Sequence, residues 1–593
     1  MHGEWHDTSP DTRAALEEAM GATSERPPDA NPVRVVRTGR QVKIDGAWEL
    51  ECESGETLAG RGPLPPNLPL GYHQLRHDSR QVRLIVSPGR CPPPSATRSW
   101  GWAVQLYALR SAASWGMGDL GDLARLTAWA AGTGAGTAMV NPLHAPRSGD
   151  AEASPYYPSS RCAYDPSYLD MAQVPGIGGH PALPALRSEA DQLNSAPLVD
   201  RKQVWQLKSA GLEWVWDQTR GGPNFEEYAR CAAPSLSTYA CFAALSETNR
   251  GPWPRWPEEV RHPSAPGVPA VPQDRLRFHM WLQWLLDLQL AAAGGHLDLV
   301  TDLAVGVDPD GADAWMWQDC FALGTRVGAP PDAFNPDGQD WGLPPLIPWR
   351  LRAAGFEPFV ATLRAALRRA RGVRIDHVMG LFRLWWIPPG AEPSEGAYVR
   401  YPASDLLDIL AVESTRAGAY VVGEDLGTVE PSVRAELAER GVLSYRLVWF
   451  EPEPPGPAWP AQSMAAVTTH DLPTVAGCWS GADVAEQRGL GLDPDGPAAA
   501  RTRDRVAEWA GLNPGAPMAE VIGAVHRLLA EAPSMIVAAT LDDALGVERR
   551  PNIPGTTAEV RPNWCLALPA TLEQVMADPV VAEVARALGR GGS

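Results

Sequence analysis

The stretch RGVRIDHVMGLFRLWWIP (residues 371–388) joins a short β-favouring segment to three ionisable side chains, Arg374, Asp376 and His377. A strand that is buried in a parallel sheet is expected to be almost entirely apolar. The charges therefore indicate a strand that ends at a pocket. Residues 357–370 precede this strand and have the spacing of an amphipathic helix. A helix followed by a short strand with a polar end is the repeating unit of a parallel α/β protein.

The same alternation of strand and helix continues along most of the chain. Apolar segments that alternate with helical patterns predict seven further strands, at residues 100–109, 136–145, 296–307, 419–425, 443–451, 463–471 and 534–546. Eight such units predict an α/β fold that closes as a (β/α)₈ barrel, the TIM barrel. A doubly wound open sheet is the alternative, but no GxGxxG fingerprint lies between the first strand and its helix.

The segments around these units have a different character. Residues 33–88 alternate short apolar and polar pieces and predict a small antiparallel β module, followed by a proline-rich linker at 87–99. We therefore expect an N-terminal β-rich domain with its linker over 1–95 and a catalytic barrel over 96–593. A long polar, proline-rich stretch at about 146–270 is expected to be an insertion in the barrel.

Composition narrows the classes of partner. The 593 residues include 51 Lys+Arg and 70 Asp+Glu, and the formal net charge of −19 repels nucleic acid and anionic membrane surfaces. The N-terminal 21 residues are polar and acidic, and no run reaches the roughly 18 apolar residues of a membrane span. Eight dispersed cysteines without a CxxC pair are typical of a reduced, cytoplasmic protein.

Polar side chains recur at the ends of three predicted strands. Arg374 and Asp376 end one strand, Glu424 ends the next, and His470 with Asp471 ends a third. The carboxyl ends of barrel strands face one shared pocket, so three carboxylates are expected to converge there. Two carboxyl groups are sufficient to break a glycosidic bond, and Arg374 would keep Asp376 ionised. His470 is interpreted either as a donor to a sugar hydroxyl or as a core histidine.

The motifs GVRIDH (372–377), VVGEDLG (421–427) and VTTHDLPT (467–474), in this order, resemble the 4-α-glucanotransferases. These are the amylomaltases, or disproportionating enzymes, of the α-amylase superfamily. The resemblance covers about 100–570 and also includes SWGMGDLGDL, SPYYPSS and PNIPGTTAEVRPNW. The segment GAPPDAFNPDGQDWGLPP (328–345) resembles the family's loop over the active site.

The resemblance implies a role for each matching residue. It makes Asp376 the nucleophile, Glu424 the general acid/base and Asp471 the stabiliser of the transition state. Six further residues are implied to contact substrate: Arg374, His470, Asp302, Tyr156 and, on the covering loop, Phe334 and Trp341. The implied chemistry uses neither a cofactor nor a metal. Ala333 and Gly311 depart from the aromatic residue and the serine that are usual in the family at these positions.

The implied activity is 4-α-glucanotransfer between maltooligosaccharides or other α-1,4-glucans, by a retaining double displacement. An aromatic loop would favour a sugar hydroxyl over water as the acceptor. An α-glucan hydrolase with the same carboxylates, a non-catalytic glycan-binding barrel and a metal-dependent barrel enzyme are the alternatives. Trp385 and Trp386, which follow the strand that carries Arg374 and Asp376, are either a further stacking surface for sugar or packing under the loop.

Overall fold

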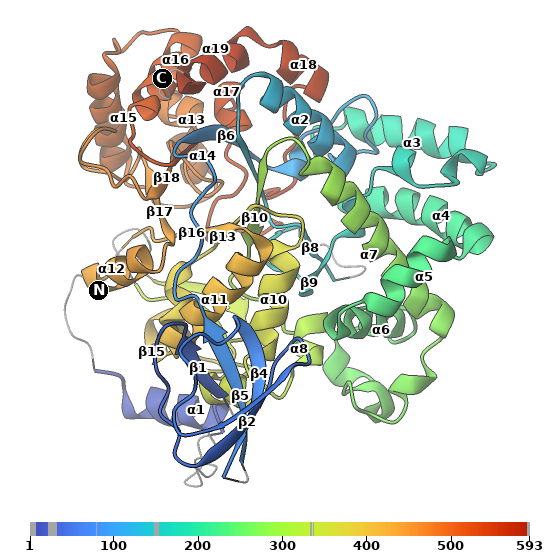
Figure 1. Cartoon of the computed structure of the whole chain (residues 1–593). Helices are drawn as coiled ribbons and strands as arrows, with labels where there is room; N and C mark the ends of the chain where they lie inside the picture. The colour runs from blue at the N-terminus through green and yellow to red at the C-terminus, as the bar shows by residue number, and fades with distance from the viewer. Residues whose placement is uncertain are drawn as a thin grey trace.

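The computed structural model describes residues 7–21, 33–78, 80–147, 153–331, 335, 337–427 and 429–589. Eight parallel strands close into a barrel in the order β10-β13-β16-β17-β18-β19-β6-β7 (Figure 1). Their bounds are β6 (Ser99–Val104), β7 (Thr137–Val140), β10 (Asp298–Leu303), β13 (Gly372–Ile375), β16 (Tyr420–Gly423), β17 (Leu443–Leu447), β18 (Ser463–Ala466) and β19 (Ile536–Thr540). Seven of the eight lie within the segments predicted as strands, and β6 begins one residue before its segment. The predicted (β/α)₈ fold is confirmed.

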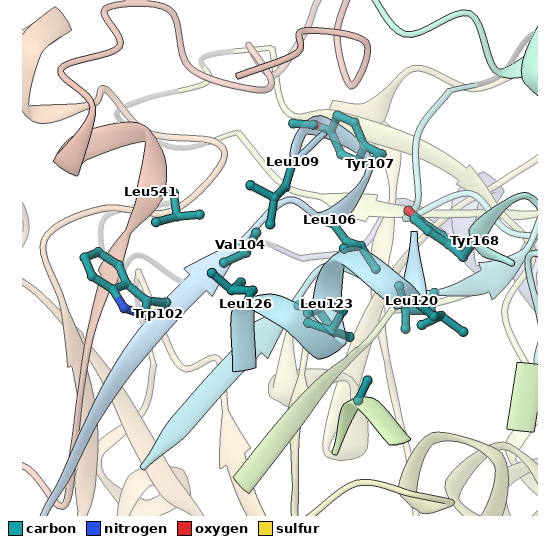
Figure 2. Close-up of a cluster of buried hydrophobic side chains, with 14 of the residues drawn as sticks. Trp102, Val104, Leu106, Tyr107, Leu109, Leu120, Leu123, Leu126, Tyr168 and Leu541 are labelled. Carbon is teal, nitrogen blue, oxygen red and sulfur yellow. The ribbon is translucent and has the colours of Figure 1, made fainter. Parts of the chain in front are cut away.

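Helices follow the barrel strands and cover them from outside. The principal ones are α2 (Leu120–Gly132), α7 (Gln273–Ala293), α10 (Glu357–Leu367), α11 (Ala403–Ala417), α12 (Pro431–Glu439) and α16 (Met518–Ala530). Figure 2 shows the core where β6 meets α2, with Trp102 and Val104 of the strand near Leu123 and Leu126 of the helix. This packing fixes the direction in which the strand ends point, because side chains in such a core interdigitate closely.

Polar side chains fix the beginning of α2 and take part in the buried face of α7. Asp119 caps α2 by accepting bonds from the backbone N–H groups of Gly121 and Asp122, and the Asp122 side chain completes the capping box. Helical spacing predicts one apolar stripe on α7 through Phe278, Trp281, Leu282, Leu285 and Leu288, which is wrong at Leu288 because this side chain is 47% exposed. With 3.6 residues per turn the buried face passes through Gln289 instead, whose amide group bonds to the backbone of Asp170.

The N-terminal strands form a separate five-stranded sheet in the order β1-β5-β4-β2-β3. The strands are β1 (Val33–Arg37), β2 (Ala47–Glu51), β3 (Thr57–Arg61), β4 (Gly71–His77) and β5 (Arg80–Ser87). The expected antiparallel pairing holds except at the edge, where β1 runs parallel to β5. The sheet is joined to barrel helix α11 through Asp408, which pairs with Arg37 and accepts a hydrogen bond from Ser87 at its carbonyl.

The segment expected as an insertion is mostly helical. It contains the short strand β9 (Ser160–Tyr164) and the helices α3 (Leu183–Ser195), α4 (Arg201–Thr219), α5 (Gly222–Cys231) and α6 (Pro234–Thr248). None of the helices in the described part of the chain has the length and apolar character that a membrane crossing requires. The eight cysteines, all inside the described ranges, are free thiols.

A second small sheet, which we call the loop sheet, was not predicted. It has the order β12-β11-β14-β15 and consists of β11 (Arg326–Ala329), β12 (Gln339–Leu343), β14 (Arg383–Ile387) and β15 (Ala397–Arg400). The covering loop expected at 328–345 therefore contains the strand β12. Trp385 and Trp386 lie on β14 and are only 5% and 0% exposed, so the packing interpretation of this pair is confirmed. Residues of the N-terminal helix α1 (Pro10–Ala19) belong to the same hydrophobic cluster as this sheet.

Candidate active site

One arginine links the ends of two neighbouring barrel strands. Asp302 of β10 and Arg374 of β13 are paired in register, so their side chains meet inside the barrel. Arg374 donates from Nη1 to both carboxylate oxygens of Asp302, at 2.7 and 2.8 Å, and from Nη2 to Oδ1 of Asp376, at 2.9 Å. The side chains of Arg374 and Asp302 are 4% and 5% exposed, whereas that of Asp376 is 22% exposed. The buried Arg374 and Asp302 therefore hold the carboxylate of Asp376, which remains accessible to a ligand.

Glu424 is held at the end of β16 by two backbone donors. Its Oε2 accepts from the N–H of His377 at 2.9 Å, and its Oε1 accepts from the N–H of Leu426 at 2.7 Å. His377 has a φ of 46°, in the left-handed region that non-glycine residues rarely adopt. Strained backbone of this kind persists where its surroundings hold it in place, and here it directs an amide toward a carboxyl group.

His470 and Asp471 lie four and five residues after β18, and the ring of His470 packs beside that of Tyr156. Nε2 of His470 is 3.4 Å from Oδ2 of Asp471, and the amide of Asn552 donates to Oδ1 of Asp471 at 2.7 Å. The hydroxyl of Tyr156 donates to Oδ2 of Asp302 at 2.6 Å and lies 3.2 Å from Nδ1 of His470. His470 is thus tied to two polar groups, as expected for a site histidine rather than for one in an apolar core.

Two residues at this site were not predicted, because they do not lie at the end of a predicted strand. The ring of Trp564 lies 5.3 Å from that of Tyr156 and 5.0 Å from that of His470, measured between centroids. Asn552 contacts Asp471 from the same loop. Both belong to the motif PNIPGTTAEVRPNW, which was the one signal in the sequence that pointed to this loop.

Burial sets the protonation behaviour of the carboxyl groups. It raises the pKa of Asp376 to about 6, with Arg374 opposing the shift and the negative Asp302 and Glu424 adding to it. Burial also raises the pKa of Glu424, although Arg374 and its two backbone donors act in the opposite direction. Because both groups face the same arginine and each other, they titrate as a coupled pair.

Asp471 behaves in the opposite way. Withdrawal from water alone would raise its pKa, but the adjacent His470 and the Asn552 amide bring the net pKa below the usual value. The Asp471 side chain is 42% exposed, so solvent screens part of this pairing. For His470, burial lowers the pKa and Asp471 raises it, with a net increase. The site thus combines one acid whose pKa is lowered, Asp471, with two acids whose pKa values are raised, Asp376 and Glu424.

A cavity adjoins the site and shares Tyr156, Asp302, Arg374 and His470 with it. Residues of several strand ends line it, among them Tyr156, Asp302, Arg374, Tyr445, His470 and Asp542. Asp542 follows the eighth strand and was not singled out from the sequence, because its segment shows no polar pattern beyond a pair of aspartates. Burial raises its pKa to about 6.

Of the two aromatic residues predicted on the covering loop, Trp341 lies beside His377, just after the end of β13. Its ring is 5.2 Å from that of His377 at an angle of 75°, and its Nε1 donates to Oε1 of Gln339 at 3.1 Å. Phe334 and the neighbouring Ala333 lie outside the described residues. Gly311 has a local reason: a Cβ there would lie 2.6 Å from the backbone of Ser159.

Known proteins share both this sequence and this fold. The family model described as 4-alpha-glucanotransferase matches residues 104–571. The 4-alpha-glucanotransferase of Mycobacterium tuberculosis is 42% identical over 606 aligned residues, which cover 92% of this chain and 82% of that protein. The one from Haemophilus influenzae is 34% identical, with 85% and 81% covered.

A solved structure agrees with the sequence relatives. The crystal structure of amylomaltase from Corynebacterium glutamicum superimposes with a TM-score of 0.87 at 30% identity, covering 99% of this chain and 96% of that one. Family model, sequence relatives and solved structure all extend over the barrel and its strand ends. The chain belongs to the 4-alpha-glucanotransferase family.

Proposed function

We propose that this chain moves a segment of α-1,4-glucan from a donor to the 4-hydroxyl of an acceptor glucan or glucose, by a retaining double displacement. Transfer between α-glucans is the activity of the family. The observation that carries the residue roles is the fork of Arg374, which holds Asp302 with one nitrogen and Asp376 with the other. Maltooligosaccharides are proposed as both donors and acceptors, and no cofactor or metal takes part.

In the first half-reaction Asp376 is the nucleophile and Glu424 the acid. A carboxylate oxygen of Asp376 forms a bond to C1 of the donor sugar while the bond from C1 to the glycosidic oxygen breaks. Glu424 gives its proton to that oxygen, so the leaving glucan departs as an alcohol. The raised pKa of Glu424 supports this role, because burial favours the protonated form from which the proton is given.

In the second half-reaction the acceptor hydroxyl replaces the departed glucan. Its oxygen attacks C1, the ester bond to Asp376 breaks, and Glu424 takes the hydroxyl proton. Two inversions at C1 leave the α configuration unchanged. Asp471 is proposed to stabilise the positive charge that develops on the sugar ring, and its lowered pKa keeps it ionised for this purpose. His470, Asp302 and Tyr156 are proposed to contact the donor sugar.

The choice of acceptor separates transfer from hydrolysis, because both pass through the same covalent intermediate. Trp341 offers a flat indole next to His377, close to the nucleophile in the chain. A sugar stacked on such a face would displace water from the second half-reaction. Phe334 is proposed as a second aromatic contact of the acceptor.

Incubation with maltotriose, followed by chromatography of the products, tests the proposal. The expected result is glucose together with maltooligosaccharides longer than maltotriose. Glucose and maltose without longer products would assign the chain to α-glucan hydrolysis, and no turnover at all would indicate a non-catalytic barrel. The same reaction with excess EDTA should proceed at an unchanged rate, since loss of activity would favour a metal-dependent enzyme.

A further inference from the structure

The N-terminal helix shares a hydrophobic cluster with the loop sheet. Leu16 of α1 is 4% exposed and belongs to this cluster, with Ala19 and Met20 partly buried against it. The cluster's buried members, which we call the loop-sheet cluster, are Leu16, Ala322, Val327, Leu343, Ile347, Leu384, Trp386 and Ala397. Val327, Trp386 and Ala397 are register partners on three adjacent strands, so they present one face of the sheet to this cluster.

Polar bonds fix both ends of α1 to segments that flank the loop sheet. The hydroxyl of Thr12 donates to the carbonyl of Glu395 at 2.9 Å, in the connection between β14 and β15. The indole N–H of Trp349 donates to the carbonyl of Met20 at 3.0 Å, from the helix that follows β12. These bonds, together with Leu16, set the position of the helix against the sheet.

The same cluster reaches the proposed acceptor site. Trp341 of β12 is partly buried against it, and the ring of Trp341 contacts that of His377. His377 follows Asp376 in the chain, and its N–H is the 2.9 Å donor to Glu424. The packing of α1 is therefore connected to the proposed nucleophile and acid/base through one indole and one histidine.

The dependence between helix and sheet is mutual. A helix of 10 residues is marginal in water on its own, so α1 owes its stability to this packing. Without Leu16 the loop-sheet face would lose part of its apolar cover, and a tightly packed interior responds to a missing side chain by shifting its neighbours. Trp341 packs against the same cluster, and a small displacement of a substrate-positioning group is enough to change a rate.

We propose that α1 is a positioning element of the acceptor site, and that Leu16 is a positioning residue that favours transfer over hydrolysis by holding Trp341 in place. The inference rests on the proposed function, since it assumes a sugar acceptor at Trp341. It gives a catalytic consequence to a segment that precedes the barrel by about eighty residues and lies outside the residues 104–571 that the family model matches.

The test compares Leu16→Ala with Leu16→Met and with Leu68→Ala. Leu68 is 6% exposed in the separate core of the N-terminal sheet, so its truncation removes a similarly buried leucine far from the loop-sheet cluster in the packing. Each variant is incubated with maltotriose at a temperature where circular dichroism shows it folded. The quantities measured are the ratio of hydrolysis to transfer, the KM for glucose as acceptor, and the rate of donor cleavage.

Leu16→Ala is expected to raise the ratio of hydrolysis to transfer by about threefold or more and to raise the KM for glucose, with cleavage nearly unchanged. Leu16→Met should restore both, and Leu68→Ala should leave both at the wild-type value. A wild-type ratio in folded Leu16→Ala, or an equal shift in Leu68→Ala, would overturn the inference. If Leu16→Ala does not fold, Leu16→Val is measured against the same criteria. Failure of the wild-type chain to make longer products would instead overturn the proposed function.

Discussion

Arg374 donates a 2.9 Å hydrogen bond to Asp376, yet the pKa of that carboxyl group is raised to about 6. Burial causes the increase, and the arginine offsets only part of it because Asp302 already binds the same guanidinium with two bonds. The proposed nucleophile is thus held precisely while its charge remains poorly stabilised. Such a carboxylate gains from forming a neutral ester with the sugar.

Asp376→Asn is expected to abolish turnover while leaving the fold and glucan binding intact. An amide cannot form the glycosyl ester, so the loss should reach about 10³-fold or more. Initial rates with maltotriose measure turnover, and isothermal calorimetry with a longer maltooligosaccharide measures binding. Activity within about tenfold of the wild type would remove Asp376 from its assigned role.

The same substitution is expected to stabilise the protein at neutral pH. Asp376 has a native pKa of about 6, above the value of about 3.9 for an unfolded chain. The native state therefore binds the extra proton between these values, and stability falls as the pH rises through this window. Removing the charge should raise the free energy of unfolding by on the order of 1–3 kcal/mol above pH ~6 and by almost nothing near pH ~4. Thermal unfolding of both proteins across this pH range measures the difference.

Asp471→Asn serves as the matched control for that measurement. The pKa of Asp471 is lowered, so its contribution to stability is present above the unfolded value and is lost as the pH falls. The control variant should therefore have a lower thermal midpoint than the wild type at neutral pH, with the gap closing in acid. Shifts of the same sign in both variants would contradict the assignment of a raised and a lowered pKa.

Arg374→Lys tests the geometry of the fork. A lysine has the charge but lacks the planar group that gives two bonds to Asp302 and one to Asp376 together. The turnover rate is expected to fall about 10²-fold, because the nucleophile loses its fixed orientation. Initial rates with maltotriose measure this loss, and circular dichroism confirms that the variant is folded. A variant that retains more than about a third of wild-type turnover would show that charge alone is needed.

Retention of configuration follows from the proposed pair of carboxyl groups. If Asp376 attacks and Glu424 assists, the sugar whose C1 reacts keeps its α configuration, so transfer forms an α linkage and the first product of hydrolysis at that carbon is the α anomer. Proton NMR of the anomeric signals during the first minutes of the reaction distinguishes this from slow mutarotation. A β anomer as the first product would require a single inversion and would exclude the covalent intermediate.

The barrel and its carboxylates could be predicted from sequence because both depend on local patterns. Apolar strands alternate with helices; Asp376 and Glu424 directly follow two of these strands, and Asp471 lies five residues after a third. The loop sheet could not be predicted in this way. Its strands are four or five residues long, and β11 pairs with β14, which lies more than fifty residues further along the chain. Pairing of this kind depends on the finished barrel, which brings the two segments together.

Trp564, Asn552 and Leu16 could not be found by searching the ends of barrel strands for polar side chains. Trp564 adopts a φ of 61°, which no local pattern for a tryptophan indicates, and it meets Tyr156 only through the fold. Leu16 lies in a short helix whose partner face belongs to the unpredicted loop sheet. In each case the missing information is a contact between segments that are far apart in the sequence.

Trp341→Ala is expected to change the fate of the glucosyl intermediate more than the rate at which it forms. The substitution removes the indole beside His377, whereas the hydrogen bonds that hold Asp376, Glu424 and Asp471 do not involve it. Aromatic contacts of this kind are worth about 1 kcal/mol, and about 1.4 kcal/mol corresponds to a tenfold change in partition. The fraction of glucosyl units that end on water should therefore rise several-fold, as product analysis with maltotriose would show.

Trp341→Phe separates the acceptor contact from packing, because Trp341 also borders the loop-sheet cluster. Phenylalanine keeps an apolar ring at this position, so thermal stability should stay close to that of the wild type, and the partition should lie between those of wild type and Trp341→Ala. If Trp341 serves packing alone, the alanine variant would lose stability and total activity together while the ratio of hydrolysis to transfer stayed constant. That pattern would assign the acceptor contact to another residue, since the cleavage chemistry at Asp376 and Glu424 would be unaffected in either case.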